Sequence, residues 1–309
     1  MSYNLSNDND FRAALRDLPD QEFTKLASSE GSDTIRLRLR ENGIQRHRVL
    51  PFQPIGDRTL IPHSTDDDYP YLIEEMEATQ AGAVTVSMGT GSSELRPMAG
   101  NRFEVRFHAN KTPTFWKNAY EFMTWKTDLK GLTLNNALLD LESQEDNNWF
   151  RVHNGIVGAL NSVNSDGKIR HRGSSGGVTR AAWNTATQHF NPFMLVPGVY
   201  VVNKTTISQL QNLGRNDWGG DGAETNFTQG LKDMNPFGVP HSVTLKQEVV
   251  PNRTMFMYAP SNFLGRAFQM QGVQAYVKKE DNIVSVRADE IVGFAIANRN
   301  AIGKWTFGT

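Results

Sequence analysis

The sequence predicts an α+β chain with an extended β segment, one long helix and a later α/β region. From 71 to 110 apolar and polar residues alternate with period two, which is typical of half-buried strands. From 133 to 163 apolar residues recur every three or four positions, the period of an α-helix. After a Gly- and Ser-rich linker at 165–177, apolar runs alternate with helical patterns. A chain of 309 residues suffices for one large domain or two smaller ones.

Composition excludes several classes of protein. The chain carries 32 lysines and arginines against 33 aspartates and glutamates, so any attraction to nucleic acid must be local. It has no cysteine, which excludes disulfides, thiolate catalysis and zinc fingers. The amino terminus is polar and acidic, unlike a secretory signal, and the most apolar window, 193–202, is too short to span a bilayer. We therefore expect a soluble protein kept in a cytoplasm, with no membrane partner.

The first distinctive segment is rich in arginine. Residues 1–31 show helical spacing of apolar residues but too few to form a core alone. The segment 35–56 then concentrates arginines in an otherwise nearly neutral chain: Arg36, Arg38, Arg40, Arg46 and Arg48. Alternation of apolar residues with arginines fits a strand here, whereas Ser32 or Asp33 can cap a short helix that ends near Gly43. The segment is therefore compatible with a strand and with a short helix.

The following region predicts a β ribbon. Two sets of apolar residues alternate with polar neighbours, namely Val84, Val86 and Met88, and Phe103, Val105 and Phe107. The Gly- and Ser-rich connection at 89–101 favours a long ribbon over a compact meander. Because an isolated ribbon is marginally stable in water, its apolar face requires a partner, and another subunit can supply one.

Two helices are predicted after the ribbon. Thr112 and Pro113 form a strong helix start, because Thr can cap orphan amides and Pro fits the first helical position. Thr133 opens a second helix that runs to 163, about 45 Å at 1.5 Å per residue. We expect six residues to form its buried core: Leu134, Leu138, Leu141, Trp149, Ile156 and Leu160. Gly155 and Gly158 weaken this helix locally.

The carboxyl-terminal half predicts alternating strands and helices. The run 194–204 is typical of a buried strand, and Thr206 with Gln209 forms a capping box for the next helix. A long Gly-rich loop follows at 215–230. Strand patterns then recur at 243–249, 254–258, 273–277, 283–286 and 292–297.

No motif predicts catalysis, a metal site or a cofactor. The Gly-rich segments lack the lysine of a phosphate loop. The seven histidines show no metal-ligand spacing, so we interpret the histidines as surface or hydrogen-bonded residues. Asp66, Asp67 and Asp68 form a charge run without the spacing of a calcium loop. The aromatic stretch 114–126 fits a buried helix face better than a stacking platform for single-stranded nucleic acid. We therefore expect a protein that is not an enzyme.

The order of elements and several local segments resemble the major capsid protein of tailed phages, with the Hong Kong 97 type fold. IRLRLRENGIQRHRVLPFQPI resembles the arm that leads to the ribbon in this family, and RFEVRFHANKTPTFWK resembles the return strand that enters the first helix. FGVPHSVTL, MFMYAPSNFLGRAF and DEIVGFAIANRNAIG resemble the later strand, loop and closing segments. Together these segments cover the chain from about Ile35 to Ile302.

The resemblance implies a division of the chain into four parts. These are an N-terminal arm at 1–56, an extended β-ribbon loop at 57–101, a peripheral domain at 102–178 and 259–309 with a long spine helix, and an α/β axial domain at 179–258. It implies a structural subunit of an icosahedral phage head that self-assembles into pentamers and hexamers and encloses double-stranded DNA. The related alternative is an encapsulin-like protein compartment of the same fold. A soluble nucleic-acid-binding module is the alternative from a different class.

The resemblance also implies partners and a location. The partners are other copies of the chain, packaged DNA bound without sequence preference, portal and scaffolding proteins, and in some members a decoration protein. The location is the virion capsid, after assembly in the host cytoplasm. Some members join subunits through a lysine of the extended loop, but 57–101 contains no lysine, so we expect no such crosslink. About thirty residues precede the arm, so we expect a separate scaffolding protein or none.

The arginine segment has three interpretations within this family. Arg36 to Arg48 either bridge carboxylates on neighbouring subunits, face the phosphates of packaged DNA, or form a solvated surface. We expect contacts to neighbours from the ribbon at Glu74, Glu75, Glu77, Val84, Val86 and Met88.

Overall fold

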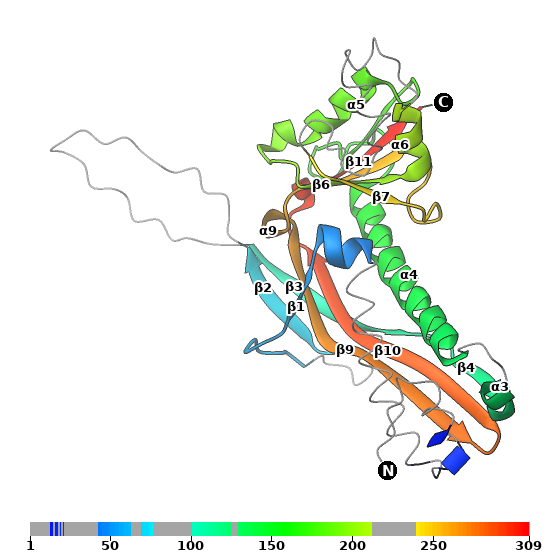
Figure 1. The fold of residues 1–309 in the computed structure, drawn as a ribbon. Helices are drawn as coiled ribbons and strands as arrows, with labels where there is room; N and C mark the ends of the chain where they lie inside the picture. Colours follow the sequence, from blue (N-terminus) through cyan, green and yellow to red (C-terminus); the bar gives the residue numbers. More distant parts are fainter. Residues whose placement is uncertain are drawn as a thin grey trace.

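The computed structural model describes residues 13–14, 16–17, 19, 21, 43–62, 69–76, 101–124, 129–211 and 239–308, and all structural statements concern these residues. The body is elongated, with one sheet and a long hairpin in its lower part and a second sheet in its upper part (Figure 1). The helix α4 (Leu129–Val157) runs beside the hairpin and reaches the second sheet at its carboxyl end (Figure 1). This mixture of helices and sheets confirms the predicted α+β class.

The first sheet is organised around a long antiparallel hairpin. Strands β9 (Gly265–Glu280) and β10 (Ile283–Ile296) form this hairpin. The sheet has the order β1-β9-β10-β3-β2, with β1 (Phe52–Pro54) parallel to β9 and β3 (Asn101–Lys111) antiparallel to both β10 and β2 (Tyr71–Met76). A short strand, β4 (Phe115–Asn118), pairs with the first four residues of β10, Ile283 to Val286.

The second sheet is mixed. Its order is β5-β11-β8-β6-β7, with bounds His171–Ser174, Ile302–Phe307, Thr254–Tyr258, Val199–Asn203 and His241–Thr244. The strand pairs β5/β11 and β6/β7 are parallel, whereas β8 is antiparallel to both β11 and β6. Every residue of β6 and β8 is buried, so both faces of the sheet centre are covered.

Alternate residues of β8 belong to two different apolar cores. Met255 and Met257 pack on the side of α5 (Arg180–Thr187), η2 (Gln188–Phe193) and α6 (Lys204–Gln211). Phe256 and Tyr258 pack on the other side against α4, in a core that also contains η1 (Gln45–Val49) and the start of β9. Period-two alternation along one strand therefore places the second sheet between two helical layers.

The buried face of α4 fixes its position against this sheet. Leu141, Trp149, Phe150 and Val157 are buried, and Trp149 Nε1 donates a hydrogen bond to Tyr258 Oη at 3.0 Å. The helix ends because Gly158 adopts a φ of 77°, a left-handed conformation that glycine tolerates.

Three short helices lie elsewhere in the described part of 101–308. They are α3 (Ala119–Thr124), α9 (Ser261–Leu264) and η5 (Arg299–Ala301).

The structure corrects several local predictions. The helix expected over 133–163 occupies 129–157, and Leu160 lies outside it and is 49% exposed, not a core residue. The helix expected at Thr112 begins only at Ala119, because Phe115 to Asn118 pair with β10 as β4. Tertiary pairing overrides a good capping signal at this position.

The long-range pairing bears on the expected division of the chain. Within the expected peripheral domain, β3 pairs with β10 and β5 pairs with β11, which joins 102–178 to 259–309. The strand β11 also pairs with β8 of the expected axial domain, so the second sheet contains strands from both parts. The predicted strand at 254–258 coincides with β8. The patterns at 273–277, 283–286 and 292–297 belong to the two long strands β9 and β10.

Candidate assembly surfaces and their internal anchor

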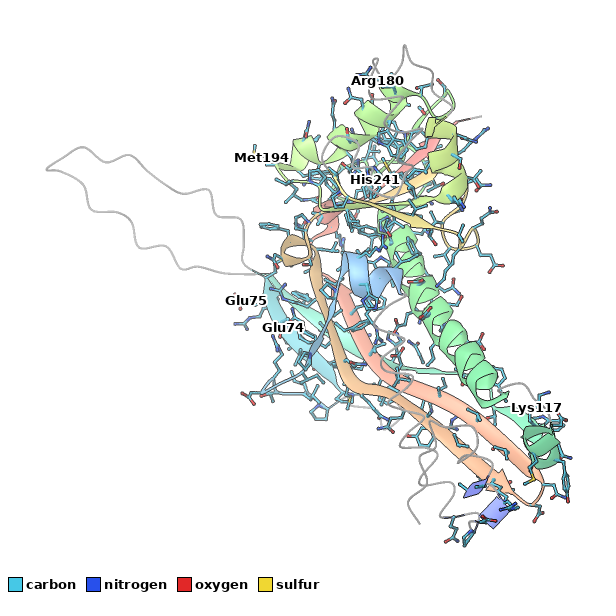
Figure 2. All side chains as sticks on the ribbon, viewed as in Figure 1. Glu74, Glu75, Lys117, Arg180, Met194 and His241 are labelled. Carbon is cyan, nitrogen blue, oxygen red and sulfur yellow. The ribbon has the colours of Figure 1, made fainter. Side chains whose placement is uncertain are left out.

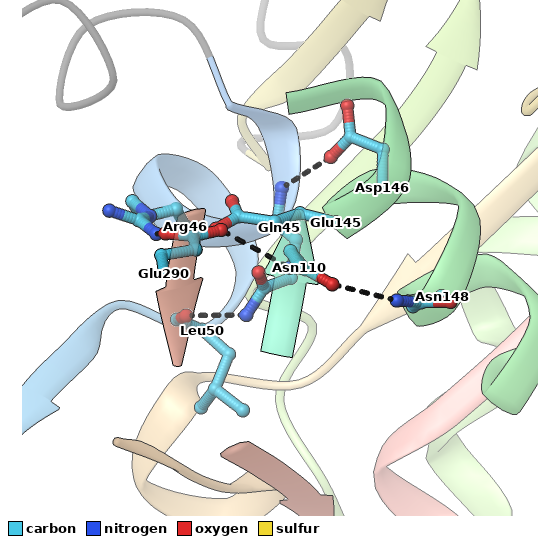
Figure 3. Close-up of polar contacts among 8 residues, drawn as sticks. All are labelled: Gln45, Arg46, Leu50, Asn110, Glu145, Asp146, Asn148 and Glu290. Carbon is cyan, nitrogen blue, oxygen red and sulfur yellow. Dashed lines mark hydrogen bonds and ion pairs between the residues drawn. The ribbon is translucent and has the colours of Figure 1, made fainter. Parts of the chain in front are cut away.

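Helix η1 places Arg46 where three distant segments meet. Arg46 is 8% exposed, and its guanidinium forms ion pairs with Glu145 of α4 and with Oε2 of Glu290 on β10, the latter at 2.7 Å (Figure 3). The guanidinium also lies over the ring of Phe52, 4.6 Å from its centroid. Arg46 thus anchors the segment after the arginine-rich stretch to the body of its own chain.

Hydrogen bonds extend this anchor to both sheets. Asn110 Nδ2 of β3 donates to Glu290 Oε1 at 3.1 Å, and Asn148 Nδ2 donates to Asn110 Oδ1 at 3.4 Å (Figure 3). The backbone N–H of Gln45 donates to Asp146 Oδ1 at 3.3 Å. The other oxygen of Asp146 accepts from Lys246 Nζ, beyond β7, at 2.8 Å. One polar network therefore joins η1, α4, β3, β10 and the segment after β7.

The network contains more buried carboxyl groups than cations. Glu145 is 3% exposed and Glu290 is fully buried, and both contact the single guanidinium of Arg46. Burial and the neighbouring Glu290 raise the pKa of Glu145 well above its usual value, against the opposing effect of Arg46. Burial also raises the pKa of Glu142, although Lys246 opposes this shift. Burial therefore favours the protonated form of Glu145.

The arginines predicted to face neighbours or DNA have different outcomes. Arg36, Arg38 and Arg40 lie outside the described residues. For Arg46 the expectation is wrong, because its charge is buried and paired within the same chain. Arg48 is exposed and has no ion-pair partner among the residues that the structure describes. Of the two described arginines, Arg48 keeps its predicted availability to a partner.

Two ribbon glutamates have partners in their own chain. Glu74 Oε1 accepts from Arg58 Nε at 2.5 Å, and Glu75 Oε2 accepts from Arg102 Nε at 3.4 Å. Figure 2 shows Glu74 and Glu75 on β2, near the point where the described part of the ribbon ends. The other predicted ribbon contacts, Glu77, Val84, Val86 and Met88, lie outside the described residues and stay predictions.

The residues predicted for the core of the long helix also have different outcomes. Leu141 and Trp149 are buried, and Ile156 packs half-buried against the same core. Leu134 and Leu138 lie on α4, but their side chains are outside the description.

Large apolar side chains are exposed in both the lower and the upper part of the molecule, and sequence reasoning missed them. In the lower part, Trp116 on β4 is 68% exposed and Tyr120 on α3 is 60% exposed. Trp116 was expected on a buried helix face, but it lies on β4 and points outward while Phe115 is half-buried. In the upper part, Met194 is 96% exposed and Val196 is 71% exposed. Contiguous exposed apolar patches often mark contact surfaces, so these groups are candidates for contact with another molecule.

Two kinds of feature are absent from the described residues, a metal-ligand cluster and a membrane-spanning helix. Across these ranges no three histidines, aspartates or glutamates are grouped so that they could hold a metal ion. The helices in the described part of the chain are too short or too polar to cross a bilayer. His153 and His189, expected at the surface or hydrogen-bonded, are fully buried, and burial lowers the pKa of His153 to about 3 and that of His189 to about 4.

Comparison with known proteins identifies the fold. No protein-family model matches the sequence, and no curated protein matches it. Three of the similar solved structures are a virus-like particle from Pyrococcus furiosus, the capsid of a native GTA particle and the mature capsid of bacteriophage PhiM1.

The likeness to these structures is extensive in length but low in sequence identity. The Pyrococcus furiosus particle is 13% identical, with a TM-score of 0.54, over 89% of this chain and 98% of that chain. The GTA capsid is 10% identical, with a TM-score of 0.55, over 82% and 90%. The PhiM1 capsid is 7% identical, with a TM-score of 0.55, over 86% and 87%. The chain therefore has the Hong Kong 97 type fold that capsid proteins of phages share.

Proposed function

We propose that this chain is the major capsid protein of a tailed phage, a structural subunit without catalytic activity. It assembles with copies of itself into the pentamers and hexamers of an icosahedral shell. The observation that supports this proposal most directly is the likeness to phage capsid chains over more than four-fifths of the molecule, including the mature PhiM1 capsid. An elongated chain with this fold has a large surface to share with its neighbours.

Features of the described surface support assembly. The exposed aromatic residues Trp116 and Tyr120 lie at one end, and the exposed Met194 and Val196 lie in the upper part. A monomer would leave these groups in water, whereas contact with another copy would remove them from it. On this proposal the arm, the ribbon loop, the peripheral domain and the axial domain have the ranges given above, with β5 and β11 assigned to the axial domain because of their pairing.

The shell would enclose double-stranded DNA in the virion after assembly in the host cytoplasm. Contact with DNA would be independent of sequence and would fall to Arg36, Arg38 and Arg40, since Arg46 is committed to its own chain. Portal and scaffolding proteins, and in some shells a decoration protein, are the further partners.

A protein-filled compartment of the encapsulin type is a second candidate. The likeness to the virus-like particle from Pyrococcus furiosus, which covers 98% of that chain, favours it. The two candidates share the assembly and differ in what the shell contains.

Electron microscopy of the purified chain, alone and co-expressed with its neighbouring genes, tests both candidates. Closed shells or regular capsomers are the expected result, and nuclease-resistant DNA inside shells made in an infection separates a phage head from a protein compartment. Monodisperse monomers in every preparation would overturn the assembly proposal. If such monomers also bound DNA with steep salt dependence, the chain would be a nucleic-acid-binding module.

A further inference from the structure

A groove lies between η1 and one end of the second sheet. Its volume is about 610 Å³, and its lining comes from η1, from the chain before β6 and β7, and from the start of α9. Rigid rings form much of its wall, namely Pro51, Pro197, Pro240 and Pro260. Because proline side chains lose little conformational entropy on binding, such a wall suits a docked peptide segment.

The groove is positively charged. Arg48 lines it, is exposed and has no ion-pair partner within the described ranges. No aspartate or glutamate is among the described lining residues. His241 also lines the groove, but burial lowers its pKa to about 4, so the imidazole is neutral near pH 7. Among the described residues, the groove therefore presents a guanidinium without an ion-pair partner, which favours a carboxylate-bearing occupant.

Exposed apolar side chains flank this charge. Val196 directly precedes the lining residue Pro197 and is 71% exposed, and Phe263 follows the lining residue Ser261 by two positions and is 53% exposed. Met194 is 96% exposed on the same segment, with a φ of 53° that non-glycine residues rarely adopt, and it projects from the upper part of the molecule (Figure 2). An occupant should carry an apolar group beside its acidic one.

One segment of the sequence has this combination. Asp66, Asp67 and Asp68 are consecutive and are followed by Tyr69 and Pro70. No lysine or arginine occurs between Arg58 and Arg96, so the neighbouring sequence supplies no cation for the aspartates. Tyr69 is 36% exposed.

The position of β2 argues for an occupant from another copy. The acidic segment leads into Tyr71, the first residue of β2, and this end of β2 points away from α9, whereas the Met76 end lies nearer to it (Figure 1). We propose that the groove of one copy receives the segment Asp66 to Pro70 of a second copy. The aspartates then pair with Arg48, and Tyr69 and Pro70 contact the apolar flank. This interface rests on the proposed self-assembly and specifies one of its contacts.

Cysteine crosslinking tests the contact directly, because the natural chain contains no cysteine. In assembled particles, the double variant Ser261→Cys with Asp67→Cys should give a ladder of dimers and larger species on a non-reducing gel after mild oxidation. Each single variant should give no ladder. Ser261→Cys paired with Asp140→Cys, at an exposed position of α4, is the matched control. Particles that form without the ladder, or a crosslink confined to monomers, would overturn the proposal.

Charge exchange gives a second, independent measurement. Arg48→Glu alone, or lysine at all three aspartates alone, should raise the concentration needed for assembly about tenfold, in keeping with the loss of a charge-assisted hydrogen bond. The combined variant should restore assembly, while Arg180→Glu, at an exposed position that is not part of the groove lining, tests for an effect of charge alone. If the wild type forms no particles, the proposed function fails. If it forms them and Arg48→Glu assembles equally well, only this contact is wrong.

Discussion

The guanidinium of Arg46 lies 2.7 Å from Oε2 of Glu290, although 244 positions separate the two residues. This ion pair connects η1 to the centre of the long strand β10, and Glu145 of α4 completes the buried cluster. The described part of the arm region is therefore held by the body of its own chain, and Arg48, two positions later, is left for a partner.

Replacing Arg46 by methionine should destabilise the isolated subunit. The substitution keeps much of the packing but leaves Glu145 and Glu290 buried without a cation. Removing one partner of a buried charge network typically costs about 3–5 kcal/mol. Urea denaturation followed by circular dichroism measures the change, with Arg48→Met as the control at an exposed position of the same helix. Equal midpoints for the two variants would contradict the role of Arg46 as an anchor.

Stability should fall as pH rises through the range in which Glu145 loses its proton. The folded pKa of Glu145 is raised above the usual value of 4.5, so the folded state holds a proton that the unfolded state releases. The stabilisation is complete below the unfolded pKa and is lost as pH rises through the folded pKa. Glu145→Gln cannot ionise at this position and should flatten the dependence.

Urea midpoints between pH 4 and pH 9 measure this slope. Glu248→Gln, at an exposed glutamate outside the network, should leave the wild-type slope unchanged. A slope that persists unchanged in Glu145→Gln would show that other groups cause it.

Buried histidines should produce the opposite dependence at low pH. His153 packs edge-on against Phe256 and Tyr258, with ring centroids 4.9 and 5.1 Å away, and burial lowers its pKa to about 3. Its contribution to stability is complete above the unfolded pKa of about 6.5 and is lost as pH falls towards 3. His153→Leu should therefore reduce the acid sensitivity of the subunit. The exposed His47→Leu serves as its control, and identical acid midpoints for the two variants would argue against His153 as a cause.

The sequence contained the signals for both buried glutamates, but not for their partner. Burial along β10 alternates strictly from Val284 to Val292, and Glu290 occupies a buried position of this alternation. Glu145 likewise lies four residues after Leu141 and four before Trp149, on the apolar stripe of α4. A carboxylate at an apolar position indicates a buried partner. That the partner is Arg46 depends on tertiary structure, which local periodicity does not contain.

Other differences have the same physical origin. Local patterns located β8 and parts of β9 and β10, because burial on one face determines alternation within a strand. They misassigned Trp116, because the pairing of β4 with β10 converts an apparent helix face into a strand with alternate residues outside. Which strand pairs with which is decided by contacts between residues far apart in sequence, such as β11 with β8.

The exposed aromatic end of the molecule should matter for assembly and not for folding. Trp116 is 68% exposed, so Trp116→Ala should change the stability of the isolated subunit by less than about 0.5 kcal/mol. Trp149 is fully buried and bonded to Tyr258, so Trp149→Ala should cost about 3–5 kcal/mol. The yield of particles by sedimentation should nevertheless fall for Trp116→Ala, because its apolar surface then has less to bury against a neighbour. Undiminished particle yield would show that this end stays in solvent in the shell.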